Sequence, residues 1–241
     1  MTILTEEGVS TGTGEPTRFV SLSPSALTFD WAECKACWWH LYVARDEKKA
    51  FRPLPKIFNN IDSAMKGCFD GQPASAMIPG ASGTIGAGRS LRSAYFVPDG
   101  CTTPIRFNGR TDFVVELADG TLCVPDAKTA EVKDEHVAFY SVQLHAYAHC
   151  LAHPDPDRKV GPAKVSRLGL YVFEPGGFMV DPTSGQAALT GKSQWLEVPI
   201  DMGAFMSFVA EVGHVVDSPS EPPSTPGCKT CAMRTREKEK A

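Results

Sequence analysis

Residues 105–128 read IRFNGRTDFVVELADGTLCVPDAK, and the pattern in this stretch decides the expected fold. Both halves are rich in β-branched and apolar residues, and segment 118–120 between them carries a hairpin turn signal. With the turn centred on Asp119, Asp112 lies seven residues before the centre and Asp126 seven residues after it. This pairing predicts that the two carboxylates face each other across adjacent strands, with Cβ atoms roughly 5 Å apart.

Three charged side chains are expected to converge on this hairpin. Asp126 and Lys128 are two residues apart, which places them on one face of a strand. Two carboxylates brought together repel each other unless a cation joins them, so the set predicts a metal site, and the lysine indicates chemistry on a phosphate. A simple surface ion pair between Asp126 and Lys128 is the alternative, but Asp112 falls inside an apolar strand, where an unpaired charge is costly. A turn register shifted by one residue would pair Asp112 with Ala127 instead.

Apolar residues lie on both faces of the hairpin, which is typical of a sheet covered on both sides and predicts an α/β fold. One face carries Val114 and Val124, and the other carries Phe113, Val115, Leu117 and Cys123. Pro125 donates no ladder hydrogen bond, so we expect the strand to bulge or to lie at a sheet edge just before Asp126.

Local patterns predict the remaining elements. We expect helices at residues 23–45, 55–69, 134–153 and 201–216, strands at 91–97, 165–173 and 195–200, a mobile glycine-rich loop at 71–88 and an extended connector at 218–226. Gln143 and Tyr147 are four residues apart and share one face of the third helix. Three histidines with the same spacing are offset from that face by about 200°, and we expect a solvent-facing row rather than a zinc site for His145, His149 and His153.

The ordered set of motifs resembles the PD-(D/E)xK nuclease superfamily in its RecB-like branch, which includes the iron–sulfur nucleases associated with CRISPR adaptation. The motifs are Gly-x-x-Asp at residues 109–112, Asp-x-Lys at 126–128 and Gln-x-x-x-Tyr at 143–147. The resemblance implies a restriction-endonuclease-like mixed sheet flanked by helices. It also implies that Gln143 and Tyr147 contact the substrate backbone or orient the site.

The resemblance implies specific roles at the hairpin. Asp112 and Asp126 would bind Mg²⁺ or Mn²⁺, helped by the backbone carbonyl of Ala127. Lys128 would position the attacking hydroxide and stabilise the developing phosphate charge. RecB-like members often carry a metal-facing histidine on an upstream helix, and this chain has none between residues 40 and 136. Asp62 is the candidate replacement ligand, with a solvated aspartate near a helix start as the equal alternative.

Two Cys-x-x-Cys pairs stand near the two ends of the chain: Cys34 with Cys37, and Cys228 with Cys231. Four thiolates suit zinc or an iron–sulfur cluster, and such a site would clasp the two ends of the domain together. The resemblance implies a 4Fe–4S cluster, with zinc as the alternative, although the family pattern is one N-terminal and three C-terminal cysteines. A disulfide within each pair and a metal-free site are further alternatives.

The chain has 241 residues, a formal net charge of −4 and 22% charged residues. We expect a flexible arm at residues 1–17, a single nuclease-like domain at 18–231 and a basic disordered tail at 232–241. The acidic balance counts against a nucleic-acid coat protein but leaves room for one local basic groove. No apolar run is long enough to cross a membrane, and scattered unpaired cysteines indicate a reducing cytoplasm.

The expected function is a Mg²⁺- or Mn²⁺-dependent deoxyribonuclease, an exonuclease acting on DNA that is single-stranded or has free ends. The alternative is a noncatalytic nucleic-acid-binding or assembly module that keeps the nuclease fold. A third interpretation is that the cysteine site senses redox state. The sequence names no protein partner.

Overall fold

In the computed structural model of the chain, the predicted hairpin consists of strands β5 (Phe113–Leu117) and β6 (Leu122–Thr129). The turn closes with a 2.9 Å hydrogen bond from the Leu117 amide to the Thr121 carbonyl. Gly120 has φ 80°, a left-handed conformation that glycine adopts without a steric penalty. The structure describes residues 18–46, 55–158 and 160–238, so the arm expected at 1–17 lies outside the described residues.

The strands form two sheets, of which the larger has the order β2-β5-β6-β7-β8 and the smaller has the order β1-β4-β3. In the larger sheet β6 and β7 run parallel and the other neighbours run antiparallel. The remaining strands are β1 (Val20–Leu22), β2 (Gly83–Ala87), β3 (Ser90–Arg92), β4 (Ile105–Arg110), β7 (Val165–Val180) and β8 (Ala187–Val198). The predicted mixed α/β fold is therefore confirmed.

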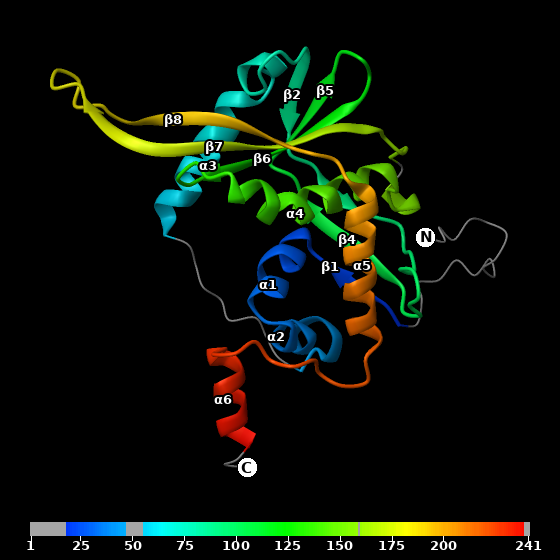
Figure 1. The fold of residues 1–241 in the computed structure, drawn as a ribbon. Coiled ribbons are helices and arrows are strands. Elements are labelled where there is room, and N and C mark those ends of the chain that lie inside the picture. Colours follow the sequence, from blue (N-terminus) through cyan, green and yellow to red (C-terminus); the bar gives the residue numbers. More distant parts are fainter. Residues whose placement is uncertain (1–17, 47–54, 159, 239–241) are drawn as a thin grey trace.

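Helices cover both faces of the larger sheet, as the two-faced apolar pattern predicts. The longer helices are α3 (Lys56–Phe69), α4 (Glu135–Ala152), α5 (Met202–Asp217) and α6 (Lys229–Lys238). Val114 and Val124 pack toward α4, whereas Phe113, Val115 and Cys123 pack on the opposite face with side chains of α3 and of the short helix η3 (Ala74–Ala76). In Figure 1 the strands β7 and β8 continue beyond the rest of the sheet as a two-stranded ribbon.

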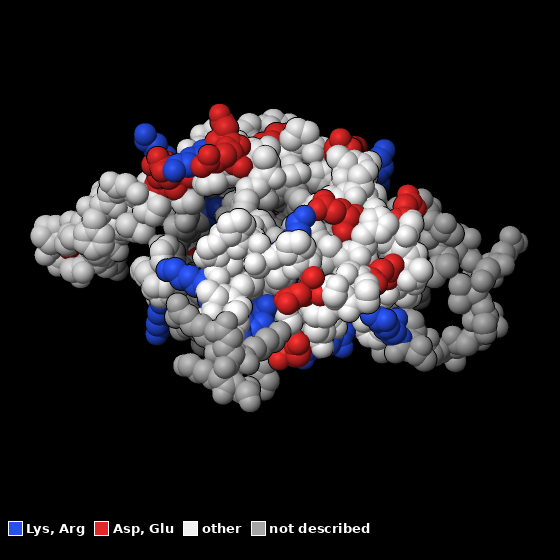
Figure 2. All heavy atoms as spheres, turned by 60° about the horizontal axis from the view of Figure 1, so that its bottom comes forward, with Lys and Arg blue, Asp and Glu red and all other residues white. Residues whose placement is uncertain are grey.

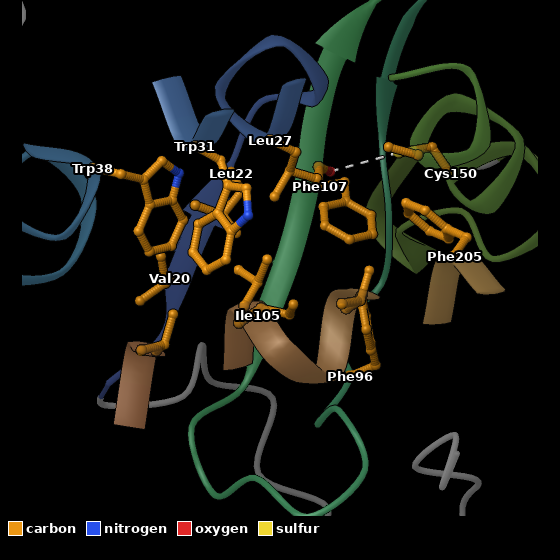
Figure 3. Packing of buried hydrophobic residues seen from close by; sticks show 14 residues of the cluster. Val20, Leu22, Leu27, Trp31, Trp38, Phe96, Ile105, Phe107, Cys150 and Phe205 are labelled. Atoms are coloured by element: carbon orange, nitrogen blue, oxygen red, sulfur yellow. Dashed lines mark hydrogen bonds between the residues drawn. The ribbon is translucent and has the colours of Figure 1, made fainter. Parts of the chain in front are cut away.

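A second core lies between α4, α5, strand β4 and the N-terminal helices (Figure 3). Phe107 of β4 is fully buried there beside Phe205 of α5 and Cys150 of α4. Trp38 is also fully buried, with its ring edge-to-face on Trp31 at 5.0 Å. Trp38 therefore belongs to the hydrophobic core.

The helix expected at 23–45 is broken into short pieces. These are η1 (Ala26–Asp30), α1 (Trp31–Glu33), α2 (Lys35–Trp39) and η2 (His40–Ala44). The break falls at Cys34, which is extended at φ −165° and ψ 115°. The Cys34 Sγ accepts a hydrogen bond from the Thr225 amide of the C-terminal connector, so a tertiary contact replaces helical continuity at this residue.

Two expectations about the larger sheet also differ from the structure. The segment expected as a mobile loop at 71–88 contains β2, which pairs with β5 and buries Ile85, so the expectation of a loop throughout is wrong. Pro125 lies in the central strand of the larger sheet, so the alternative of an edge position is wrong, whereas the β6–β7 ladder does have an irregularity between Leu122 and Cys123, in line with the alternative of a bulge. The ladder between β5 and β6 ends at the pair of Val115 and Cys123, two residues before Pro125. The missing amide hydrogen of Pro125 therefore costs β5 no ladder hydrogen bond.

The histidines of α4 do not form the solvent-facing row that the sequence predicts, because α4 is covered on two sides. His145 and His149 are buried against the second core and do not face solvent. The His145 ring bridges the Ser141 carbonyl and the Asp201 amide, and burial lowers the pKa of His149 to about 3. These histidines are therefore structural parts of the α4–α5 packing.

Helix α6 covers the first part of the segment expected as a disordered tail at 232–241, and residues 239–241 lie outside the described residues. The helix is continuous with Cys228 and Cys231, since the Ala232 amide donates to the Cys228 carbonyl. In the described part of the chain, no helix has the length and apolar character that a membrane span requires.

Replacing Phe107 with alanine should destabilise the fold strongly, because the change leaves a cavity in the second core. We expect the free energy of unfolding to fall by about 3–5 kcal/mol in a denaturant titration. Phe178→Ala on the β7–β8 ribbon is the matched control: its side chain is 70% exposed, so the change should stay within about 0.5 kcal/mol. Equal losses for the two variants would contradict the core assignment.

Candidate functional site

Asp126 is a buried carboxylate in the central strand of the larger sheet, with 3% of its surface exposed. Its Oδ1 accepts a 3.1 Å hydrogen bond from Gln143 Nε2, and its Oδ2 forms an ion pair with Lys128. Burial raises the pKa of Asp126 to about 6, the Lys128 charge opposes this shift, and the Asp112 charge adds to it. Asp126 is thus held beside a second carboxylate by two specific donors.

Asp112 lies at the corner between β4 and β5, where the chain passes from one sheet to the other. Its Oδ2 accepts a 2.9 Å hydrogen bond from the Ala127 amide. The aspartate side chain therefore makes a hydrogen bond to β6 at a point beyond the end of the β5–β6 ladder. The β5–β6 ladder ends at Val115 opposite Cys123, and Asp112 precedes β5, so the predicted cross-strand pair is not part of the ladder. Asp112 nevertheless lies close enough to Asp126 that, besides burial, its charge raises the pKa of that carboxyl. The structure therefore brings together the three residues that the sequence predicts to converge.

Lys128 points into the same site and is largely buried. Burial alone would lower its pKa, but the Asp126 charge raises the pKa above its usual value. The ammonium group also lies 4.5 Å from the centre of the Tyr140 ring, a cation–π contact. Lys128 is therefore a fixed positive charge at the carboxylate pair.

Gln143 and Tyr147 reach the site from α4. Gln143 Nε2 lies 3.4 Å from the Tyr147 hydroxyl in addition to its bond to Asp126. The Tyr147 hydroxyl donates to the Arg110 carbonyl at 2.9 Å, which fixes the corner that carries Asp112. A Cβ at Gly109 would lie 3.2 Å from the Tyr147 ring and 2.8 Å from Pro24, so this close approach requires the glycine of the first motif.

Asp62 does not join the other two aspartates directly. Lys66, one turn later on α3, lies between Asp62 and Asp112. Its Nζ is 2.8 Å from Asp62 Oδ2 and 2.7 Å from Asp112 Oδ1. Among the described residues, Asp62, Asp112 and Asp126 do not form a group of converging ligand atoms. The motif reasoning missed Lys66, although its spacing of four residues from Asp62 on an expected helix is visible in the sequence.

The donor set at the carboxylates suits a hard divalent cation. It offers only carboxylate and carbonyl oxygens, which are the ligands that Mg²⁺ and Mn²⁺ prefer. Three aspartates and two lysines give a net charge of −1, counting Asp62, Asp112 and Asp126 against Lys66 and Lys128. The residues present therefore fit the metal that the motifs imply, and their assignment as ligands stays a prediction.

The four cysteines form a second site at the base of the N-terminal helices. Their sulfur atoms all lie within 4.8 Å of one another, and none of the four is in a disulfide. The Sγ separations are 3.4 Å for Cys37 to Cys231, 3.6 Å for Cys37 to Cys228 and 3.7 Å for Cys34 to Cys231. Zinc–sulfur bonds of about 2.3 Å in a tetrahedron place the sulfurs about 3.8 Å apart, so these distances suit one tetrahedral ion.

The thiols of this site cannot all ionise independently. Burial alone would raise the pKa of Cys34, but backbone donors at Cys37 and Thr225 lower it to about 6. Burial and the neighbouring thiols raise the pKa of Cys37 well above its usual value, and burial raises the pKa of Cys231 to about 11. A bound cation would remove this conflict, because it stabilises all the thiolates together.

Arg234 of α6 supports the cysteine site from outside, and sequence reasoning did not identify it. Its Nη2 lies 3.6 Å from Cys37 Sγ, and its Nη1 lies 3.2 Å from Glu221 Oε2. The same glutamate oxygen is 2.6 Å from His40 Nε2. Charged partners of this kind orient metal ligands and offset the charge of the thiolates.

Comparison with known proteins shows one family. The PD-(D/E)XK nuclease superfamily matches residues 32–236. No curated protein matches the chain significantly. Among solved structures, the fold is similar to that described as "Crystal structure of SSO0001", at 12% identity and a TM-score of 0.48, covering 89% of this chain and 84% of that chain. At these values the likeness carries no argument about function.

Loss of one ligand should empty the cysteine site. We expect Cys228→Ser to reduce the bound metal per chain, measured by elemental analysis, and to lower the melting temperature, because the clasp between the chain ends is lost. Cys68→Ser is the matched control, since Cys68 is exposed and outside the cluster. Full metal content in Cys228→Ser would contradict the four-cysteine site.

Proposed function

Because the chain belongs to the PD-(D/E)XK nuclease superfamily, we propose that it is a metal-dependent deoxyribonuclease that hydrolyses phosphodiester bonds. The observation that carries the proposal is the convergence of Asp112, Asp126 and Lys128 at one point of the central hairpin. Superfamily membership alone indicates a nuclease fold. The intact acidic pair with its lysine is the reason to propose an active enzyme.

The proposed ligands of Mg²⁺ or Mn²⁺ are the carboxylates of Asp112 and Asp126 and the carbonyl of Ala127. Asp62, the further ligand that the sequence predicts, pairs with Lys66 in this structure. A divalent ion bound there supplies an activated water and neutralises phosphate charge, as metal ions do in phosphodiester cleavage generally. The Ala127 amide orients Asp112 at 2.9 Å, so the pair is preorganised before any ligand arrives. Preorganisation limits the rearrangement that metal binding requires.

The proposed role of Lys128 is to stabilise the negative charge that develops on the phosphorus oxygens. A charge that is fixed and largely desolvated acts more strongly than one in water. Gln143 and Tyr147 are proposed to orient the site, since one binds Asp126 and the other fixes the corner of Asp112. The proposed roles of Gln143 and Tyr147 thus rest on hydrogen bonds that these residues make in the fold.

The finer proposal is a RecB-like exonuclease that acts on single-stranded DNA or on DNA with free ends. It rests on the order of the motifs and on their resemblance to that branch. Figure 2 shows one face of the molecule, where basic and acidic side chains are interspersed among the coloured residues. On the face shown, the coloured residues do not form one continuous basic surface of the kind that binds DNA broadly along its backbone.

We propose that the cysteine site is a structural clasp for a single domain spanning residues 18–231. The sulfur separations favour one tetrahedral ion, which makes zinc the first candidate. A 4Fe–4S cluster, which the resemblance implies, holds four iron atoms inside the thiolate shell and needs wider separations than those of this structure. Iron, sulfide and zinc analysis of anaerobically purified protein distinguishes the two.

A noncatalytic DNA-binding or assembly module is the second candidate function. The observation that favours it is that Asp62 pairs with Lys66 and does not complete a three-carboxylate group with Asp112 and Asp126. A cleavage assay on single-stranded, double-stranded and flapped DNA, with and without Mn²⁺, separates this candidate from the nuclease. Cleavage that requires Mn²⁺ supports the enzyme, and binding without cleavage supports the module.

We expect Lys128→Ala to lower the rate of DNA cleavage by roughly 100- to 1,000-fold, the usual cost of removing one preorganised charge stabiliser. DNA affinity should change little, because one buried lysine contributes little to nonspecific binding. Cleavage is measured on labelled DNA in Mg²⁺, and thermal melting verifies the fold. Lys192→Ala, at an exposed position of β8, is the control and should cleave normally. Wild-type turnover by Lys128→Ala would refute the role.

We expect Asp112→Asn to lose Mn²⁺ binding as well as cleavage, because the amide removes a ligand charge. Titration calorimetry with Mn²⁺ measures this directly, without DNA. Asp157→Asn is the matched control, since the Asp157 side chain is 89% exposed and far more accessible than Asp112. Unchanged Mn²⁺ affinity in Asp112→Asn would overturn the proposed ligand set.

A further inference from the structure

Lys66 belongs to none of the three motifs, yet its ammonium group contacts the carboxylate site directly. It lies 2.7 Å from Asp112 Oδ1 and 2.8 Å from Asp62 Oδ2. Both contacts are charge-assisted, and together they link helix α3 to the corner that holds Asp112. The position of this lysine therefore has to be explained together with the proposed metal site.

Each of the four oxygens of Asp112 and Asp126 already has a donor or cation beside it. The partners are the Ala127 amide, Gln143 Nε2, Lys128 and Lys66. The first is backbone in the central strand, and the next two are side chains largely buried in the site. A divalent ion that approaches this pair must share or displace one of these four partners.

Lys66 is the partner with the most freedom to move. Its side chain is 37% exposed, against 19% for Lys128, and α3 contributes no fully buried residue to the core. Lysine is positively charged at neutral pH, and the two carboxylates within 2.8 Å of the Lys66 ammonium group favour the charged form. An ammonium group and a divalent ion are attracted to the same carboxylate oxygen, and each weakens the binding of the other.

We infer that Lys66 is an internal cation that competes with the divalent ion for Asp112 and, once displaced, binds a phosphate oxygen of the DNA. The inference rests on the proposed function of the carboxylate site. Asp62 then holds the lysine near the site, a different role from the metal ligand that the sequence predicts. Lysine suits this task because it acts on phosphate as a compact point charge on a flexible stem.

Competition predicts that removal of the lysine charge strengthens metal binding. We expect Lys66→Met to bind Mn²⁺ roughly two- to fivefold more tightly than wild type, the range that one partly exposed ion pair supports. Titration calorimetry of the full chain, with its cysteine site as purified, gives the affinity. Lys66→Arg keeps the charge and should resemble wild type, and Lys56→Met, at an exposed position on the same helix, should leave the affinity unchanged.

Displacement predicts that Lys66 contributes to DNA binding only when Mn²⁺ is bound. The measurement is fluorescence anisotropy of a labelled single strand with phosphorothioate linkages that resist cleavage, so that Lys128 and the other partners of the two carboxylates stay in place. With Mn²⁺, Lys66→Met should reduce the slope of log affinity against log salt by about 0.7, the value of one lost phosphate contact on a single strand. Without added Mn²⁺ the slope should not change, because Asp62 and Asp112 hold the lysine.

The outcomes separate this inference from the proposed function. If wild type binds no Mn²⁺, the proposed function fails and the inference fails with it. If wild type binds Mn²⁺ and Lys66→Met binds it equally well, the inference alone is overturned. An equal gain in Lys56→Met, or a loss of DNA affinity that does not depend on Mn²⁺, also overturns it, because either result indicates general electrostatics without displacement.

Discussion

The site depends on a carboxylate buried in the central strand of a sheet. An isolated charge there would be strongly unfavourable, so Asp126 has its own partners in Gln143 and Lys128. The second acid, Asp112, is held where the β5 ladder ends and where Pro125 leaves no amide to be satisfied. The interruption in the sheet and the acidic pair are therefore parts of one arrangement, which is stable only with cations nearby.

Helix α4 connects this arrangement to the rest of the molecule. One side of it presents Gln143 and Tyr147 to the hairpin, and the other packs His145, His149 and Cys150 into the second core. Because both sides are buried, the helix is held in place by two packed surfaces. That rigidity is what allows one tyrosine hydroxyl to fix the Asp112 corner, and it explains why Gly109 has no room for a side chain.

The cysteine site constrains the molecule at its other end. Cys37 and Cys228 are 191 positions apart in sequence, and their sulfurs lie 3.6 Å apart. A link across so long a loop removes a large amount of chain entropy from the unfolded state. In the proposed function a metal ion held by these cysteines would anchor α6 and the broken N-terminal helices, with Arg234 and Glu221 beside the site. The two sites thus have separate tasks, one structural and one chemical in the proposed function.

Sequence alone determined the hairpin, its turn at Asp119, the proximity of Asp112 to Asp126 and the four-cysteine set, because these follow from local periodicity, residue counts and ligand type. It did not reveal strand β2, the break at Cys34 or the burial of His145, since each depends on what packs against a segment from far along the chain. The contact of Lys66 with Asp112 joins helix α3 to the corner between β4 and β5, so it too depends on the packing of segments that are distant in sequence. Only the tertiary structure decided it, because periodicity identifies the face of a helix but not the group that the face will meet.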